Sequence, residues 1–138
     1  MSIVTPLEPM TAGIHHLGLS VLDITKTSAF FIDVLGYKQV GEVAGYPAIF
    51  VSDGTTMLTL WQLDQTADVV SFDRNKNAGL HHVALNVRSH EALDQLNNTF
   101  QSLDNVDIEF APIPLGDSPM RHMMCIIPGG LRVEFIAS

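Results

Sequence analysis

The stretch His81-His82-Val83-Ala84-Leu85-Asn86-Val87 has a near copy upstream, His15-His16-Leu17-Gly18-Leu19-Ser20-Val21. Both copies begin with two histidines and continue with an apolar residue, a small residue, leucine, a small polar residue and valine. They are offset by 82 − 16 = 66 residues, which is about half of the 138-residue chain. The sequence therefore predicts two copies of one unit, each opening with a strand that carries a histidine near its start.

The first unit has the pattern of one strand, one helix and three strands. Residues 14–22 alternate in the manner of a strand, and Asp23 is a suitable N-cap for a helix. We expect this helix to end at Gly36, because glycine readily adopts the left-handed conformation that terminates helices. Three further strands are predicted at residues 37–43, 48–52 and 57–62.

The second unit repeats this order. Residues 80–87 predict a strand, and Ser89 is placed to cap a helix. Three more strands are predicted at residues 106–111, 122–127 and 131–136. Residues 64–79, between the units, are polar and predict either a functional lid or a disordered connection. The expected fold class is therefore α+β, with two β-α-β-β-β units.

Composition excludes several classes of partner. The net charge is −8, and the seven Lys and Arg are scattered singly, so we expect no nucleic-acid partner. No apolar run approaches the roughly 18 residues of a membrane span. Residues 1–12 lack the layout of a signal peptide and predict a short N-terminal arm. The single Cys125 predicts a buried core thiol. We therefore expect a cytoplasmic protein that acts on a small molecule.

Strand alternation predicts a candidate metal site. It sends His16 and His82, from the two copies, and Glu134, from the last strand, to the concave side of a sheet. Two histidines and one carboxylate are a common ligand set for Fe(II), Mn(II), Zn(II) or Ni(II). A strand histidine is more often a hydrogen-bonded residue, and a glutamate near the C-terminus is usually solvated. The repeat favours the metal interpretation, because the histidines occupy equivalent positions.

The chain resembles the vicinal-oxygen-chelate superfamily, which includes glyoxalase I, fosfomycin-resistance proteins, methylmalonyl-CoA epimerase, extradiol dioxygenases and bleomycin-resistance proteins. The resemblance runs from about Ile14 to the C-terminus. It rests on the two histidine strands, on Phe30-Phe31-Ile32-Asp33-Val34-Leu35-Gly36-Tyr37, and on Pro128-Gly129-Gly130-Leu131-Arg132-Val133-Glu134. It implies a single domain over residues 13–138, with units 13–63 and 80–138. It also implies a curved mixed sheet around a metal-binding cup, with helices on its outer face.

The resemblance places the metal ligands at His16, His82 and Glu134. A fourth ligand of glyoxalase I, usually Glu or Gln, falls on Thr59, whose hydroxyl is a poor ligand. The expected site therefore has three ligands, and we do not expect an ordinary glyoxalase I. Glu134 and His122 are the candidate catalytic residues, and Thr59, Trp61 and Arg121 are candidates for the substrate pocket. His15 and His81 have the opposite strand parity and receive no role.

Two classes of function remain open at this point. The first is a divalent-metal enzyme that chelates two substrate oxygens, with lyase, isomerase or dioxygenase-like chemistry. The second is a metal-free protein of the bleomycin-resistance type, which sequesters a drug in the same cup. We prefer the enzyme, because all three ligand types are present. The resemblance further implies a homodimer. It leaves two arrangements open: a site within one chain, or a shared site with His16 from one chain and His82 and Glu134 from the other.

Overall fold

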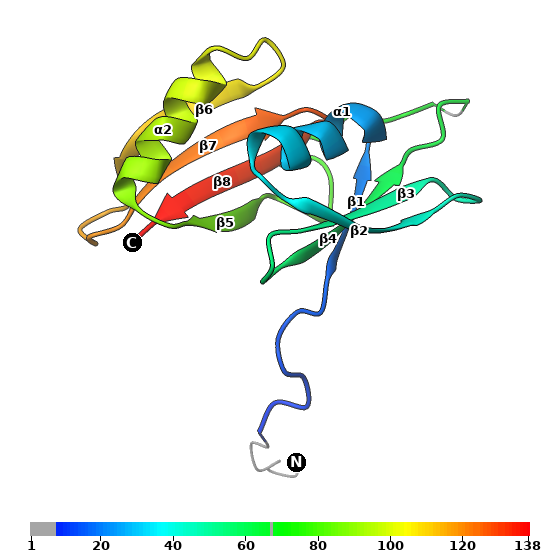
Figure 1. Cartoon of the computed structure of the whole chain (residues 1–138), viewed down its shortest axis with the longest axis horizontal. Helices are drawn as coiled ribbons and strands as arrows, with labels where there is room; N and C mark the ends of the chain where they lie inside the picture. The colour runs from blue at the N-terminus through cyan, green and yellow to red at the C-terminus, as the bar shows by residue number, and fades with distance from the viewer. Residues whose placement is uncertain (1–7, 67) are drawn as a thin grey trace.

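A computed structural model describes residues 8–66 and 68–138. Part of the expected N-terminal arm, residues 1–7, lies outside the described residues. Figure 1 shows two β-sheets side by side, with helix α1 at their junction and helix α2 lying across the second sheet. Within the described ranges, no helix is both long and apolar enough to cross a membrane.

The first unit forms one four-stranded sheet with a helix. In chain order its elements are β1 (Leu17–Val21), α1 (Ile24–Ala29), the π-helical turn η1 (Phe30–Val34), β2 (Lys38–Val43), β3 (Ala48–Ser52) and β4 (Met57–Gln62). The strands lie in the order β1-β4-β3-β2. β1 runs parallel to β4, and the other neighbours are antiparallel.

The second unit has the same topology. Its elements are β5 (Val83–Val87), α2 (His90–Gln101), β6 (Asp107–Pro114), β7 (Arg121–Ile127) and β8 (Leu131–Ala137). Its strand order is β5-β8-β7-β6, again with one parallel pair, β5 with β8. The predicted α+β fold of two β-α-β-β-β units is therefore confirmed.

The helices begin where the sequence predicts. The Asp23 carboxylate accepts a hydrogen bond from the Lys26 backbone N–H at 3.0 Å, and the Ser89 hydroxyl accepts one from Ala92 at 3.0 Å. The first helix does not stay regular to Gly36. It widens at Phe30, whose carbonyl accepts from the Leu35 N–H at 3.2 Å. Gly36 then ends it with a φ of 80°.

Two strand boundaries differ from the prediction in a way that matters for the site. β1 begins at Leu17 and β5 begins at Val83. His16 and His82 therefore stand immediately before the strands, not within them. The first paired residue of each strand fixes where the neighbouring histidine lies, but the histidines themselves are not paired with another strand.

Alternation along the strands gives each sheet a helix-covered face and an opposite face, which we call the open face. Leu58 and Leu60 of β4 and Val133 and Phe135 of β8 are buried on the covered faces. The two units share one core through Phe100, whose ring centroid lies 5.6 Å from that of Phe30 and 5.3 Å from that of Phe135.

Other contacts support this shared core. The buried Thr27 hydroxyl donates to the Pro128 carbonyl at 2.8 Å, which joins α1 to the turn before β8. Cys125 lies in the same core with no exposed surface, as predicted, and burial raises the pKa of its thiol to about 12.

The Phe100 contacts yield a stability prediction. Replacing Phe100 by alanine removes a ring that packs on both units and leaves a cavity at their junction. We expect Phe100→Ala to lower the free energy of unfolding by about 3–5 kcal/mol, measured by urea denaturation. Asn98→Ala, on the exposed side of the same helix, should change it by no more than about 0.5 kcal/mol. A loss below about 1 kcal/mol for Phe100→Ala would contradict a shared core.

Candidate functional site

The open face of the second sheet carries a cluster of polar side chains. Strand register places Glu134 of β8 opposite Ala84 of β5 on one side and Met124 of β7 on the other. His122 of β7 stands opposite Ile136, two residues farther along β8, and so shares this face. Glu134 is only 9% exposed. A carboxylate at that depth needs partners, because burying it alone is costly.

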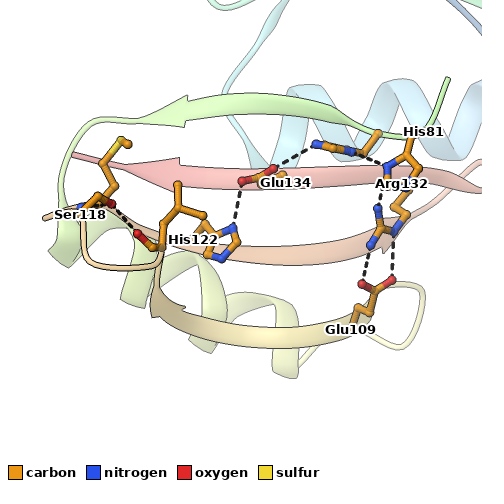
Figure 2. Close-up of polar contacts among 9 residues, drawn as sticks. His81, Glu109, Ser118, His122, Arg132 and Glu134 are labelled. Carbon is orange, nitrogen blue, oxygen red and sulfur yellow. Dashed lines mark hydrogen bonds and ion pairs between the residues drawn. The ribbon is translucent and has the colours of Figure 1, made fainter.

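Two histidines supply those partners, one for each carboxylate oxygen. His82 Nε2 lies 3.1 Å from Glu134 Oε1, and His122 Nδ1 lies 2.9 Å from Glu134 Oε2. Figure 2 shows the contact between His122 and Glu134 across the open face. Each oxygen of the Glu134 carboxylate therefore has one histidine partner. The structure brings together three of the predicted site residues: His82, His122 and Glu134.

Hydrogen bonding indicates which nitrogen of His82 carries its proton. Arg132 Nη1 donates to His81 Nδ1 at 3.3 Å, since a guanidinium can only donate. Desolvation and the charge of Arg132 lower the pKa of His81, which favours its neutral form. His81 Nδ1, as an acceptor, then also accepts a hydrogen bond from His82 Nδ1, 2.7 Å away. With its proton on Nδ1, His82 presents Nε2 to Glu134 Oε1 as a lone pair in the neutral ring and as a donor in the imidazolium.

In the neutral ring, two acceptors face each other at this point. His82 Nε2 and Glu134 Oε1 need a proton or a cation between them for the contact to be favourable. This is a chemical property of the donor set and not of the fold alone. Sequence reasoning gave His81 no role, although the repeated His-His pair was the available signal.

The first unit repeats the histidine pair. His15 Nδ1 lies 2.9 Å from His16 Nδ1, and their rings meet edge to face with centroids 5.2 Å apart. The rings of His81 and His82 meet in the same way at 5.0 Å. In each unit, the first histidine of the pair contacts Nδ1 of the second and does not engage its Nε2. His15 thus has the same relation to His16 that His81 has to His82.

Arg132 is itself fully engaged. It is 6% exposed and binds Glu109 of β6 through two contacts, Nε to Oε1 at 3.0 Å and Nη2 to Oε2 at 2.6 Å. The hydrogen bond from Arg132 lowers the pKa of Glu109, and the same bond raises the pKa of Arg132. Arg74 of the connection between the units also approaches Glu109, at 3.6 Å. The pairing leaves Arg132 little free charge to offer a ligand.

Thr59 occupies the position in the first unit that Glu134 occupies in the second. Gly18, two residues after His16, pairs with Thr59, as Ala84, two residues after His82, pairs with Glu134. Thr59 is 3% exposed, and its hydroxyl accepts a hydrogen bond from Trp61 Nε1 at 2.9 Å. The first unit therefore presents a hydroxyl and an indole where the second presents a carboxylate.

Four predicted site residues lie apart from the cluster: Thr59 and Trp61 on the first sheet, and His16 and Arg121. Among the described residues of one chain, no three His, Cys, Asp or Glu side chains are arranged to hold a metal ion, and the side-chain partner of His16 is His15. Arg121 lies on the covered face of β7, alternating with His122, and binds Asp94 of α2 through Nη2 to Oδ1 at 3.0 Å. This placement differs from the expected one, so we leave Arg121 out of the pocket.

Comparison with known proteins identifies the family to which this architecture belongs. Residues 13–135 match the family model of the Glyoxalase/Bleomycin resistance protein/Dioxygenase superfamily. The chain belongs to this superfamily. The match covers both units, including both histidine pairs and Glu134, and it confirms the predicted family.

Individual relatives show how broad the family is. The chain is 36% identical to mitochondrial methylmalonyl-CoA epimerase of Mus musculus over 81 residues, 54% of this chain and 45% of the relative. It is 49% identical to catechol-2,3-dioxygenase of Bacillus subtilis (strain 168) over 46 residues, 33% of this chain and 16% of the relative. The chain thus spans less than half the length of both relatives.

A solved structure shares the fold. The fosfomycin resistance protein FosX from Listeria monocytogenes aligns with a TM-score of 0.69 at 18% identity, covering 94% of this chain and 95% of that chain. At that identity the likeness concerns the fold only.

The histidine pair yields a prediction on metal affinity. His81→Phe keeps the ring but removes the nitrogen that accepts from His82, so Nε2 is no longer set as an acceptor. We expect a loss of divalent-metal affinity of about 10- to 100-fold, measured by isothermal titration with Ni(II). His81→Asn keeps an acceptor at about the same place and should recover most of it. Unchanged affinity in His81→Phe, with His90→Ala as the control histidine, would contradict this role.

Proposed function

We propose that the protein is a divalent-metal enzyme of the vicinal-oxygen-chelate type, acting on a small substrate bound through two adjacent oxygens. The observation that carries the proposal is the contact of His82 Nε2 with Glu134 Oε1 at 3.1 Å. Two ligands about 2.1 Å from one ion and at a right angle stand about 3.0 Å apart. The donor pair therefore fits a first-row metal.

A divalent ion held there would act as a Lewis acid toward the substrate oxygens. The residues around it have separate tasks in this proposal. His82 and Glu134 are ligands, and His81 sets the tautomer of His82. His122 acts through Glu134 as a positioning residue, since its Nδ1 holds Oε2 at 2.9 Å and so leaves Oε1 for the ion. The reaction is of the lyase, isomerase or dioxygenase-like classes found in this superfamily.

We further propose that a second copy of the chain completes the site with its His16. β1 and β5 are edge strands of their sheets, with unpaired backbone groups along one side. The open-face residues Gly18 and Ser20 of β1 and Ala84 and Asn86 of β5 are exposed. Pairing β1 of one chain with β5 of another would cover both edges and bring a His16 to a His82–Glu134 pair.

Mixing variants tests the shared site. His16→Ala and Glu134→Gln should each lose most bound Ni(II), measured by atomic absorption after desalting. Unfolding the two together at equal amounts and refolding should restore about a quarter of the wild-type sites, because half of the dimers are mixed and each mixed dimer has one intact site. His82→Ala mixed with Glu134→Gln is the matched control and should restore none, since both residues belong to the same half.

The outcomes separate the alternatives. Loss of metal in both single variants, without recovery on mixing, would place the whole site within one chain. A wild-type protein that binds no Fe(II), Mn(II), Zn(II) or Ni(II) would refute the metal enzyme and favour metal-free sequestration of a small molecule.

Thr59 yields a prediction on the reaction. Its hydroxyl oxygen accepts from Trp61 and is a poor metal ligand, so the site lacks the fourth ligand of glyoxalase I. We expect weak turnover of the hemithioacetal of methylglyoxal and glutathione with Zn, Ni or Mn. Thr59→Glu should raise it, and Thr59→Val, which adds no ligand, should not. Wild-type efficiency of about 10⁴ M⁻¹s⁻¹ or more would contradict this expectation.

A further inference from the structure

Three aromatic side chains gather on the open face of the first sheet. Trp61 of β4 has its ring centroid 5.1 Å from that of Tyr46 and 6.1 Å from that of Phe50. Phe50 of β3 stands opposite Thr59 of β4, which fixes its face. Tyr46 is 60% exposed, and Phe50 and Trp61 are partly exposed. We call Tyr46, Phe50 and Trp61 the aromatic platform.

Glycines on neighbouring strands make room for these rings. A Cβ added to Gly41 of β2 would stand 2.9 Å from Phe50 Cδ2, too close for an ordinary contact. A Cβ on Gly18 of β1 would stand 3.2 Å from Thr59 Oγ1 and 3.6 Å from Trp61 Nε1. The rings therefore pack directly against the backbone of these glycines, and this close packing restricts their movement.

A hydrogen bond fixes the indole. Trp61 Nε1 donates to the buried Thr59 hydroxyl at 2.9 Å, which satisfies the only polar group of the indole. Its π face stays available for contact with a ligand. Because Thr59 corresponds to Glu134, the platform is anchored at the ligand-equivalent position of the first unit. In the proposed dimer, the copy that supplies His16 also supplies this platform, so a ligand whose oxygens reach the metal would have the rest of its structure beside these rings.

The charges on the open faces favour a ring over a second anionic group. Arg132, on the open face of the second sheet, is neutralised by Glu109 through two hydrogen bonds. The chain as a whole carries a net charge of −8. With Arg132 paired and the chain acidic, an aromatic platform recognises a planar apolar group better than a phosphate or a second carboxylate.

We propose that the substrate carries an aromatic ring next to its two chelating oxygens, and that the aromatic platform selects it by stacking. This inference rests on the metal site of the proposed function and on the second copy that completes it. It adds a specificity-determining role for Phe50 and Tyr46 and gives Trp61 a defined contact with the substrate.

Three chelators with one metal-binding group test the proposal. Mandelate, hexahydromandelate and lactate all present a 2-hydroxy carboxylate, but they carry an aromatic ring, a saturated ring of the same size and a methyl group. Binding to the Ni(II)-loaded protein is measured by isothermal titration. Trp61 is the only tryptophan, so its fluorescence reports whether the ring reaches the platform.

We expect mandelate to bind about 2- to 10-fold more tightly than hexahydromandelate, the range for an aromatic contact beyond its buried area. Mandelate alone should shift the Trp61 emission strongly. Phe50→Leu and Trp61→Leu should bring the affinity ratio near one, and Phe72→Leu, a ring on the connection, should leave it unchanged.

The possible failures are distinct. Equal affinities for mandelate and hexahydromandelate in the wild-type protein, with lactate still bound, overturn the aromatic proposal and leave the metal site in place. A protein that binds no Ni(II) removes the proposed function and this inference together. The wild-type comparison decides the question even if a variant fails to fold.

Discussion

The parallel pairing of β5 with β8 is the constraint on which the candidate site depends. It joins strands from opposite ends of the second unit and sets Glu134 opposite Ala84, two residues after His82. Six of the seven residues of β8 are buried, so the Glu134 carboxylate has little access to water. His82 and His122 contact it in place of solvent.

The same strand register in the first unit leads to a different surface. Thr59 stands where the repeat would place a carboxylate, and Trp61 lies over it with a hydrogen bond to its hydroxyl. The second unit therefore provides polar side chains, and the first unit provides aromatic rings. A repeated unit can diverge in this way because open-face side chains contribute little to the core, whereas Leu58, Leu60, Val133 and Phe135 must keep packing under the helices.

The pairing of Arg132 with Glu109 further distinguishes the open face of the second sheet from that of the first. Glu109 accepts two hydrogen bonds from one edge of the Arg132 guanidinium, Nε and Nη2, and Arg132 Nη1 in turn donates to His81. A chain of contacts therefore runs from β6 through β8 to the nitrogen of His82 that faces away from Glu134. The Arg132 charge is paired within the protein and orients a histidine. It therefore does not offset the net negative charge at the exposed surface.

The sequence by itself determined the two-unit fold, the caps at Asp23 and Ser89 and the shared face of His82 and Glu134, because these follow from repeats and from short-range periodicity. It also singled out His122. Only the tertiary structure decided that His122 contacts Glu134, that Arg121 turns toward Asp94, and that His81 orients His82. Those relations depend on which strands become neighbours, on one-residue strand boundaries and on side-chain rotamers. None of these is encoded by local pattern, because they are set by packing between segments far apart in the chain.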